Sequence, residues 1–572
     1  MQLLKKAIIA ITSIIINITF AYKAHSQSTP PEGINIPSDI PEPVEETIPE
    51  REQQPIITPT PIPPPKLQTP ETPQRTKPTT PSNIRFNIKK IEVLGNTVLE
   101  DEINQLVEKY QNQNLSFADL IQLRTEITQL YIDNNYQTSG AFVVNNQLLN
   151  NGIAQIQVVE GQLESIEISG LQRLKPSYVR SRLQAASKPP LNRERLESAL
   201  QLLQIDPLLQ QVNAELTAGS APGKNILQIV VQEAPAFHSG VAVANNQSPS
   251  IGSVQGNVFA RHDNLLGFGD SLSVEYGLTD GLDIYSIGYS VPVNSRNGTV
   301  NLRYSNNNSE IVEDTFEDLD IRSDSETFSL SFRQPIVRKP DTEFALSVGL
   351  DLRRSQTFIL DDIPFSFSEG PEDGKSRVSA IRFTQDWVKR DAKTVLAARS
   401  QFSFGIDAFN ATVNDSGTDA RFFSWLGQFQ WVRRVSDRNV VLASINTQLT
   451  PDSLLSLERF SIGGVDTVRG YRQNQLVSDN GVLGALELRI PLTENPQTLQ
   501  INPFFEMGLG WNNRSENPDP EFIAGLGLGV QWEVTEGLNA RVDYGIPLVA
   551  VEEKGDTLQD NGLYFSLRYQ PF

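Results

Sequence analysis

An arginine and a glutamate far apart in the chain are the residues best suited to specific polar chemistry. Arg469 stands in the tetrapeptide Val468-Arg469-Gly470-Tyr471, within a long loop over residues 450–481. Glu506 stands in a segment where apolar and polar residues alternate, as they do along a strand. A guanidinium and a carboxylate can form two parallel hydrogen bonds, which fix geometry as well as supplying attraction. The pair indicates a loop anchored to a strand; the alternative is that Arg469 is a solvated loop charge.

Glycines accompany Glu506 on one face of two neighbouring predicted strands. Strand parity places them opposite a row of large apolar residues. Glycine inside a strand costs stability and often marks the close approach of another backbone. We therefore expect a smooth inner wall on which the loop lies, and the alternative is that the glycines only relieve crowding within the wall. The five glycines are Gly508, Gly510, Gly525, Gly527 and Gly529.

Other reactive chemistry is scarce. The chain has no cysteine, which excludes disulfides and thiolate metal sites, and its three histidines (His25, His238 and His262) do not suggest a metal or catalytic cluster. Residues 370–376 are one residue short of a phosphate-binding loop and are better interpreted as a polar loop between strands. The net charge of −20 argues against nucleic acid as a partner. We expect no enzyme activity, no cofactor and no metal ion.

Residues 236–572 have the pattern of strands throughout. Segments of about ten residues alternate apolar and polar positions, and there are about sixteen of them, joined in turn by short and longer connections. In the segment from Phe522 to Val534, large apolar residues occupy every second position. A soluble sandwich would also alternate, but the segment length and even count favour a 16-stranded transmembrane antiparallel β-barrel. Closure of a barrel removes the sheet edges that lipid cannot satisfy.

Two similar units precede the predicted barrel, at residues 84–161 and 162–235. Each contains a strand, two helices and two further strands, in a β-α-α-β-β order that is repeated in tandem. In the first unit the strands are expected at 86–94, 140–144 and 153–159. The fold is thus mainly β, with two small mixed domains ahead of the barrel.

The N-terminal 83 residues differ from the rest of the chain. Residues 1–26 fit a secretory signal peptide: Lys5-Lys6 precede an apolar run that is shorter than the roughly 20 residues of a membrane-spanning helix. Residues 27–83 are rich in proline and poor in aromatic residues, so we expect a disordered, extended linker. Export to the cell envelope follows from the first of these two predictions.

Taken together, these features resemble one family. Two POTRA-like modules followed by a barrel with an inward loop are similar to the TpsB transporters of two-partner secretion (the haemolysin secretion/activation type), within a superfamily that includes the outer-membrane assembly insertase. The resemblance extends over nearly all of the chain from Ile84 onward. Its motifs are Thr138 to Phe142, Val158 to Gly161, Asn264 to Asp270, Val468 to Tyr471, and Phe504 to Gly508.

The resemblance implies a location and a function. It implies a barrel in the bacterial outer membrane, POTRA domains in the periplasm, and transport of an unfolded, β-helical (TpsA-like) exoprotein to the cell surface. Exposed strand edges at 140–144 or 212–217 could bind that cargo by strand addition, and cargo folding outside would drive transport. The family's arginine and its acidic partner correspond to Arg469 and Glu506. Two alternatives stay open: an assembly insertase or import channel of the same superfamily, and a passive porin.

Three departures from the family pattern matter. Glu506 stands where the family usually has aspartate, so the reach of the pair differs by one methylene. The prolines of residues 29–81 leave little room for the N-terminal plug helix of some relatives. The C-terminal Phe572 resembles the terminal aromatic recognised by the barrel-assembly machinery, but Pro571 and strand parity predict an irregular end.

Overall fold

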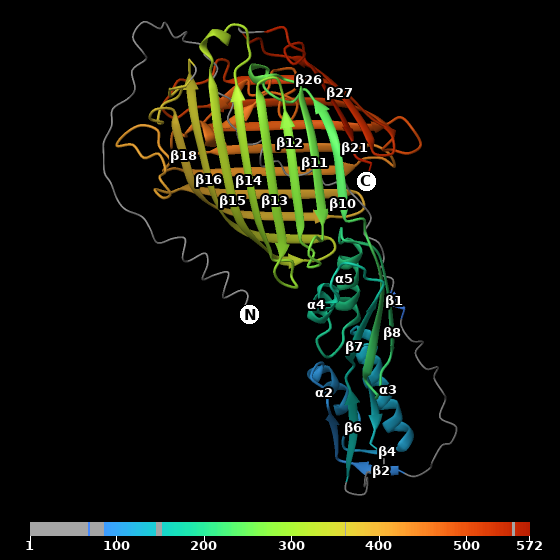
Figure 1. Ribbon diagram of the computed structural model, residues 1–572. Helices are drawn as coiled ribbons and strands as arrows, with labels where there is room; N and C mark the ends of the chain where they lie inside the picture. Colours follow the sequence, from blue (N-terminus) through green and yellow to red (C-terminus); the bar gives the residue numbers. More distant parts are fainter. Residues whose placement is uncertain (1–66, 69–84, 145–151, 361, 552–554, 572) are drawn as a thin grey trace.

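The chain forms a closed barrel with two small domains stacked beneath it (Figure 1). The structure is a computed structural model, and it describes residues 67–68, 85–144, 152–360, 362–551 and 555–571. The predicted signal peptide, most of the proline-rich segment and Phe572 lie outside the described residues. Within those residues, no helix is long and apolar enough to cross a membrane.

The first domain contains more strands than the sequence pattern predicts. The expected strand at 86–94 is interrupted at Lys89, and an unpredicted strand pairs with its first half. The second helix begins where Ser116 and Asp119 cap each other reciprocally, which satisfies donors that a helix start leaves free. The elements are β2 (Arg85–Ile88), β3 (Lys90–Leu94), α2 (Glu100–Glu108), β4 (Gln113–Ser116), α3 (Phe117–Asp133), β5 (Gly140–Val143) and β6 (Ile153–Val159).

Glu160, at the end of the first domain, holds three parts of that domain together. Its carboxylate accepts from the backbone N–H of Thr97 at 2.7 Å and from the hydroxyl of Tyr131 at 2.9 Å. Burial, and then this bond to Glu160, raises the pKa of Tyr131 well above its ordinary value. The motif Val158 to Gly161 is therefore a structural junction in this domain.

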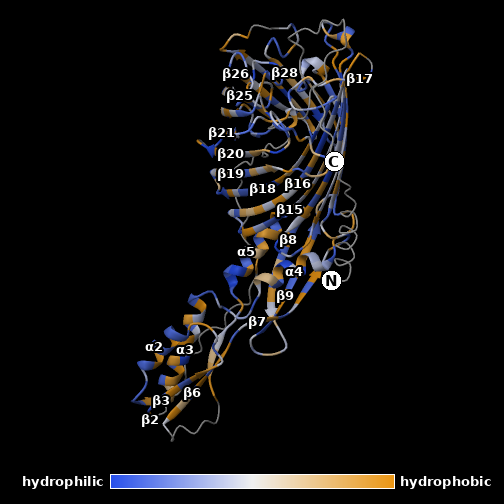
Figure 2. Cartoon of the chain, turned by 90° about the vertical axis from the view of Figure 1, so that its left-hand side faces the viewer, coloured by the Kyte–Doolittle hydropathy of each residue, from blue (hydrophilic) through white to orange (hydrophobic). Residues whose placement is uncertain are grey.

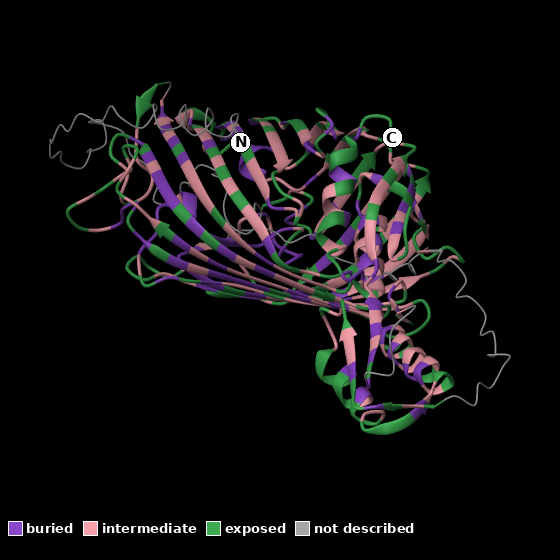
Figure 3. Cartoon of the chain, turned by 90° about the horizontal axis from the view of Figure 1, so that it is seen from below, coloured by how far each residue is buried: buried purple, intermediate pink, exposed green. Residues whose placement is uncertain are grey.

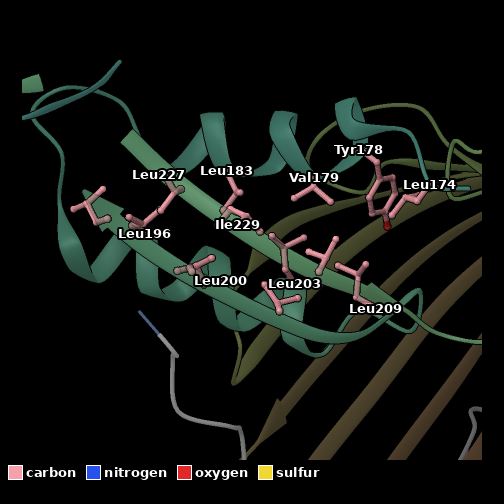
Figure 4. Close-up of a cluster of buried hydrophobic side chains, with 14 of the residues drawn as sticks. Leu174, Tyr178, Val179, Leu183, Leu196, Leu200, Leu203, Leu209, Leu227 and Ile229 are labelled. Atoms are coloured by element: carbon pink, nitrogen blue, oxygen red, sulfur yellow. The ribbon is translucent and has the colours of Figure 1, made fainter. Parts of the chain in front are cut away.

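The second domain has the predicted β-α-α-β-β order and one added strand. A core of leucines and valines lies between its two helices and its sheet (Figure 4). The sheet order is β1-β8-β9-β7, in which β1 (Leu67–Gln68) pairs in parallel with Ala214 and Glu215. The predicted disorder of 27–83 thus does not extend to these two residues. The other elements are β7 (Gln162–Ser169), α4 (Pro176–Ala186), α5 (Arg193–Gln204), β8 (Leu209–Ala218) and β9 (Lys224–Glu233).

The predicted 16-stranded antiparallel barrel is confirmed. Each long strand pairs with the next, and the ring closes where Val241 to Ala244 pair with Tyr569 to Ser566. A two-residue strand, β17 (Ile363–Pro364), adds to the outer end of one hairpin. The long strands are β10 (Phe237–Ala244), β11 (Gln255–Asp263), β12 (Ser271–Leu278), β13 (Leu282–Pro292), β14 (Thr299–Glu310), β15 (Arg322–Arg338), β16 (Thr342–Ile359), β18 (Lys375–Arg390), β19 (Thr394–Gly405), β20 (Phe423–Arg434), β21 (Val440–Leu449), β24 (Asn480–Pro491), β25 (Leu499–Trp511), β26 (Phe522–Thr535), β27 (Leu538–Pro547) and β28 (Leu563–Tyr569).

The two faces of the barrel wall differ in chemistry. Hydrophobic and hydrophilic residues alternate along the strands (Figure 2), and so do exposed and buried ones when the barrel is seen from below (Figure 3). On β25 the side chains of Phe505 and Met507 are exposed, whereas Glu506 between them is 4 % exposed. Successive side chains of a strand point to opposite faces, so the apolar row faces lipid and the glutamate faces the lumen.

A turn of the barrel docks onto the second small domain. The backbone N–H of Lys175 donates to the carbonyl of Gly267 at 2.9 Å, and its ammonium lies 3.2 Å from the ring centre of Phe268. A Cβ on Gly269 would lie 2.4 Å from the ring of Tyr178, so the turn approaches as closely as glycine allows. The segment Asn264 to Asp270, singled out by the family resemblance, thus joins the second small domain to the barrel.

Candidate functional site

The connection between β21 and β24 folds into the barrel. Residues 450–479 carry a short 3₁₀ helix, η4 (Ser456–Glu458), and a small hairpin of β22 (Phe460–Ile462) and β23 (Leu476–Ser478). Most of this loop is buried, although it contributes no strand to the ring. Apolar residues of its hairpin and tip form a cluster with the wall, made of Leu426, Phe460, Ile462, Val468, Tyr471, Leu476, Leu483 and Ile523.

Arg469 at the tip of this loop contacts Glu506 through its side chain and its backbone. Its Nε donates to both carboxylate oxygens, at 2.9 and 3.1 Å, and its Nη2 also donates to Glu506. Its backbone N–H donates to the same carboxylate at 2.8 Å. The guanidinium carbon lies 3.4 Å from the ring centre of Phe504, which packs against its flat face. Both charged side chains are almost completely buried.

Two further carboxylates bind Arg469, which corrects the expectation of a lone acid at Glu506. Asp543 on β27 accepts from Nη1 at 2.7 Å, and Glu487 on β24 accepts from Nη2 at 3.3 Å. Arg541 and Arg489 pair with these acids in turn, so each of the three carboxylates faces a guanidinium group, and the carboxylate of Asp466 also lies near Arg469 and Arg541. A buried charge cluster needs such pairing, because an unpaired buried ion is very costly.

Part of this correction was accessible from the sequence. Glu487 lies on the same predicted inner face of its strand as Arg489, opposite a run of leucines, so parity alone marks it as a lumen residue. Asp543 stands on β27, two strands away from β25, and the registers of β25 with β26 and of β26 with β27 bring it to Arg469. Those registers cannot be derived from alternation along a single strand.

The two residues after Arg469 are held by the last barrel strands. The hydroxyl of Tyr564 accepts from the backbone N–H of Gly470 at 2.9 Å and donates to the carbonyl of Tyr471. The hydroxyl of Tyr471 donates to the carbonyl of Ala524 at 2.9 Å. Gly470 has φ of 111°, and its N lies 2.5 Å from where a Cβ on Gly545 would stand. The tip therefore fits against the wall only because both positions lack side chains.

The five predicted glycines divide into two groups. A Cβ on Gly525 would lie 2.1 Å from the carbonyl oxygen of Arg469, and Cβ atoms on Gly508 and Gly510 would lie 2.5 Å from Ile462 and Ser478 of the loop. These three lie under the loop. A Cβ on Gly527 would instead meet the backbone of Tyr544 and the ring of Phe504, and one on Gly529 would meet the carboxylate of Asp543 at 2.4 Å. The second group gives space to side chains around Arg469.

The remaining sequence candidates form no reactive centre in the part of the chain that the structure describes. No group of three or more metal-ligating side chains occurs there. Gly370 and Gly374 lie in the connection between β17 and β18, with the N–H of Gly374 bonded to Ser366. His238 and His262 stand on neighbouring strands β10 and β11, at the end of the barrel next to the small domains.

Comparison with known proteins assigns this geometry to a family. The profile described as "Haemolysin secretion/activation protein ShlB/FhaC/HecB" matches residues 223–532, which is more than half of the chain. The chain belongs to this family. The profile "POTRA domain, ShlB-type" matches residues 86–161, the first small domain. The resemblance inferred from the sequence is confirmed.

Individual relatives agree with this assignment. The outer membrane transporter CdiB of Escherichia coli is 25% identical over 492 residues, which are 81% of this chain and 79% of that protein. The heme/hemopexin transporter protein HuxB of Haemophilus influenzae is 23% identical over 444 residues, 75% of this chain and 76% of that protein. The solved structure of CdiB from Escherichia coli covers 90% of this chain and 94% of its own, at 22% identity and a TM-score of 0.65, and shows the same fold.

This member of the family is an outer-membrane transporter of the two-partner secretion (TpsB) type. It works with a secreted exoprotein, and its POTRA domain lies on the periplasmic side of the membrane. The predictions of function and of location are thereby confirmed. The connections 245–254, 279–281, 311–321, 360–374, 406–422, 450–479, 512–521 and 548–562 then lie at the end of the barrel away from the POTRA domains, and the inward loop is the sixth of them.

Proposed function

We propose that an unfolded, β-helical exoprotein is threaded through the barrel lumen and that residues 450–479 are the gate. The observation that carries this proposal is the anchor of Arg469 on Glu506, Glu487 and Asp543 inside the lumen. A porin that only sieves solutes needs no loop whose tip is tied to the wall by one arginine and three carboxylates. The proposed cycle contains no enzymatic step, and cargo folding outside the cell supplies its direction.

The loop can move without opening the wall. Strands β21 and β24, from which the loop leaves and to which it returns, pair directly from Val440–Arg489 to Gln448–Gly481. The hydrogen bonds of the ring are therefore complete without the loop, as a barrel in lipid requires. Displacement of the loop breaks the ion pairs of Arg469 and the packing of the loop against the wall, but the hydrogen bonds of the sheet stay intact.

Cargo capture is proposed at the edge of β8 in the second small domain. This edge already accepts extended backbone, because Leu67–Gln68 pair with it in parallel. The other predicted edge, β5, is less suitable, because the N–H of Ala141 donates to the hydroxyl of Thr128 on α3 at 3.0 Å. Strand addition uses main-chain hydrogen bonds and so places little demand on cargo sequence.

The barrel itself is proposed to be inserted into outer-membrane lipid by the barrel-assembly machinery. In support, β28, the last strand, presents Leu567 and Tyr569 on the exposed face, and both are more than two-fifths exposed. This row continues the lipid-facing pattern of the preceding strands to the end of the described chain.

Co-expression tests the proposed function directly. The transporter would be expressed with a β-helical exoprotein encoded beside it, and the exoprotein measured in the medium and in the periplasm. We expect the exoprotein in the medium only when the transporter is present, with periplasmic retention or degradation otherwise. Equal amounts in the medium with and without the transporter would contradict the proposal.

A further inference from the structure

The inward loop is tied to the barrel at a second place, where the charges are reversed. Glu458, at the end of η4, is 1 % exposed. Its carboxylate accepts from Arg382 of β18 at 2.8 and 3.0 Å and from Arg353 of β16 at 3.2 Å. At this anchor the loop supplies the anion and the wall supplies the cations, whereas Arg469 is a loop cation among wall anions.

The surroundings of Glu458 form a balanced and organised cluster. Arg382 also donates to Asp351 at 2.6 Å and to the hydroxyl of Ser403 at 2.7 Å. Among the described residues, two guanidinium groups thus face two carboxylates. The carbonyl of Glu458 accepts from the amide of Gln448 at 2.9 Å, which fixes the backbone as well as the side chain.

Apolar packing adds to this anchor. Leu454, Leu455 and Leu457, just before Glu458, are almost completely buried. They share a cluster with Val378 and Ala380 on the wall and with Ala420 and Phe422 of a neighbouring outer connection. Three leucines in a lumen loop are otherwise unexpected, since a solvated loop gains nothing from them.

The two anchors lie at different places on the barrel wall. Around the ring, Arg382 stands on the eighth and Glu506 on the thirteenth of the sixteen long strands. Residues 454–471, which we call the cross-lumen segment, join these two places within the lumen. Between the anchors, Phe460 packs against Gly481 and Ile462 against Gly508, so the segment follows the inner face of the wall.

We propose that Glu458, held by Arg353 and Arg382, is a positioning residue of the gate: it fixes the far end of the cross-lumen segment, so that release of Arg469 alone leaves the lumen partly obstructed. The inference rests on the proposed gating function of the loop. Cargo passage then requires that the ion pairs at both anchors break. Because the two anchors have opposite polarity, Glu458 cannot bind at the acidic site of Arg469, and Arg469 cannot bind at the basic site of Glu458, since like charges would meet there.

Two substitutions test the anchor. Glu458→Gln removes the anion and leaves two buried arginines with one of their two carboxylates among the described residues. The double variant Glu458→Gln, Arg353→Gln removes one charge of each sign, so Asp351 and Arg382 remain paired. If the single variant fails to insert into the membrane, this double variant still tests the anchor. The matched control is Glu326→Gln, which disrupts the exposed Glu326–Arg354 pair at 3.1 Å on adjacent strands β15 and β16. Exposed pairs of this kind contribute little.

Two measurements distinguish the role of Glu458 as an anchor from the role of the loop as a gate: the rate of thiol labelling reports the anchor, and conductance reports the gate. The chain has no cysteine, so Leu455→Cys supplies a single thiol that a membrane-impermeant maleimide reaches only when the cross-lumen segment lifts. In the balanced double variant we expect labelling to be about tenfold faster or more, because loss of a buried ion pair shifts a local opening equilibrium by at least that factor. Planar-bilayer conductance should show longer open events, and the Glu326→Gln control should match the parent.

The outcomes are distinguishable. Labelling and conductance equal to the parent in an inserted, heat-modifiable double variant would overturn the second anchor. Faster labelling with unchanged conductance and unchanged export would support the anchor and contradict the proposed gating function. Faster labelling with longer openings supports both.

Discussion

Arg469 donates to Glu506 both through its guanidinium and through its own backbone N–H, the latter at 2.8 Å. A single carboxylate therefore fixes the arginine side chain and the direction of the chain that carries it. A substitution at Arg469 leaves the backbone bond possible, whereas loss of the Glu506 carboxylate removes both. The pair is thus asymmetric, and the wall residue holds more of the loop than its partner does.

Replacement of Arg469 should leave the barrel inserted and stop export. Arg469→Ala leaves buried carboxylates without their main partner, and breaking a buried pair costs about 3–5 kcal/mol, so the tip should lose its defined position on the wall and the loop should no longer return to it after each displacement. Arg469→Lys should also impair export, because lysine lacks the planar fork that reaches several carboxylates at once. Exoprotein in the medium is measured beside heat-modifiability of the barrel. Arg303→Ala, at an exposed wall position on β14, is the control. Parent-level export by both Arg469 variants would refute the role of this anchor.

Substitutions at Glu506 test whether the length or the charge of its side chain holds Arg469. Glu506→Asp restores the aspartate usual in the family but shortens the side chain by one methylene, so it can keep the backbone bond or the side-chain pair and not both at present distances. We expect reduced export and more frequent channel openings. Glu506→Gln keeps the length but removes the charge and should be more severe. If the glutamine variant exported better than the aspartate variant, length rather than charge would be the controlling property.

Substitution of a glycine under the loop should displace the loop tip as substitution of the charged residues does. In Gly525→Ala the new Cβ would stand 2.1 Å from the carbonyl oxygen of Arg469, so the loop tip must move. Overpacking of this kind costs about 1–3 kcal/mol, and we expect raised conductance with no change in charge. Gly256→Ala on β11 is the matched control, since its Cβ would meet nothing within 4 Å. Identical conductance in the two variants would show that the tip does not depend on this contact.

Site-specific crosslinking distinguishes the two candidate cargo edges. A photoreactive amino acid at Glu215, an exposed position of β8, should crosslink the exoprotein during export, because β8 accepts extended backbone. The same amino acid at Phe142, on β5 and 47 % exposed, should crosslink much less. A stronger product at Phe142 would move the capture site to the first domain.

Most of the architecture could be predicted from the sequence because lipid imposes a strict rule on it. A wall between lipid and lumen must alternate every second residue, and the strands from Phe522 and from Leu563 follow that rule to within one residue. Helix starts were also predictable, as at Asn192, whose side chain caps α5. The short strands β1 and β4 were not predicted, because two to four residues carry too little periodicity, and β2 was predicted only as the first half of one longer strand.

The site was only partly predictable, and the reason is distance around the ring. Arg469, Glu506 and the glycines of β25 and β26 lie on adjacent elements, so parity could suggest their proximity. The contact of Asp543 depends on the register of three consecutive strands, and the second anchor at Glu458 depends on which part of the wall the loop reaches. The apolar run Leu454 to Leu457 inside a supposedly polar loop was the one available signal for the second anchor.

The central claim is that residues 450–479 must leave the wall for cargo to pass, and a reversible crosslink tests it most directly. A Cβ on Gly508 would lie 2.5 Å from Cγ2 of Ile462, close enough for a disulfide in a chain that has no other cysteine. The double variant Ile462→Cys, Gly508→Cys should be inserted but inactive when oxidised, and should regain export on reduction.

The matched control locks the base of the same loop. In Ser478→Cys with Gly510→Cys, the two Cβ atoms would lie 3.3 Å apart, next to the start of β24, where the loop rejoins the ring. This variant should export normally whether oxidised or reduced. The decisive measurement is the amount of exoprotein in the medium from the oxidised Ile462–Gly508 variant, with the crosslink verified. The account predicts almost none, restored by reductant, and export at the parent level with the crosslink intact would contradict it.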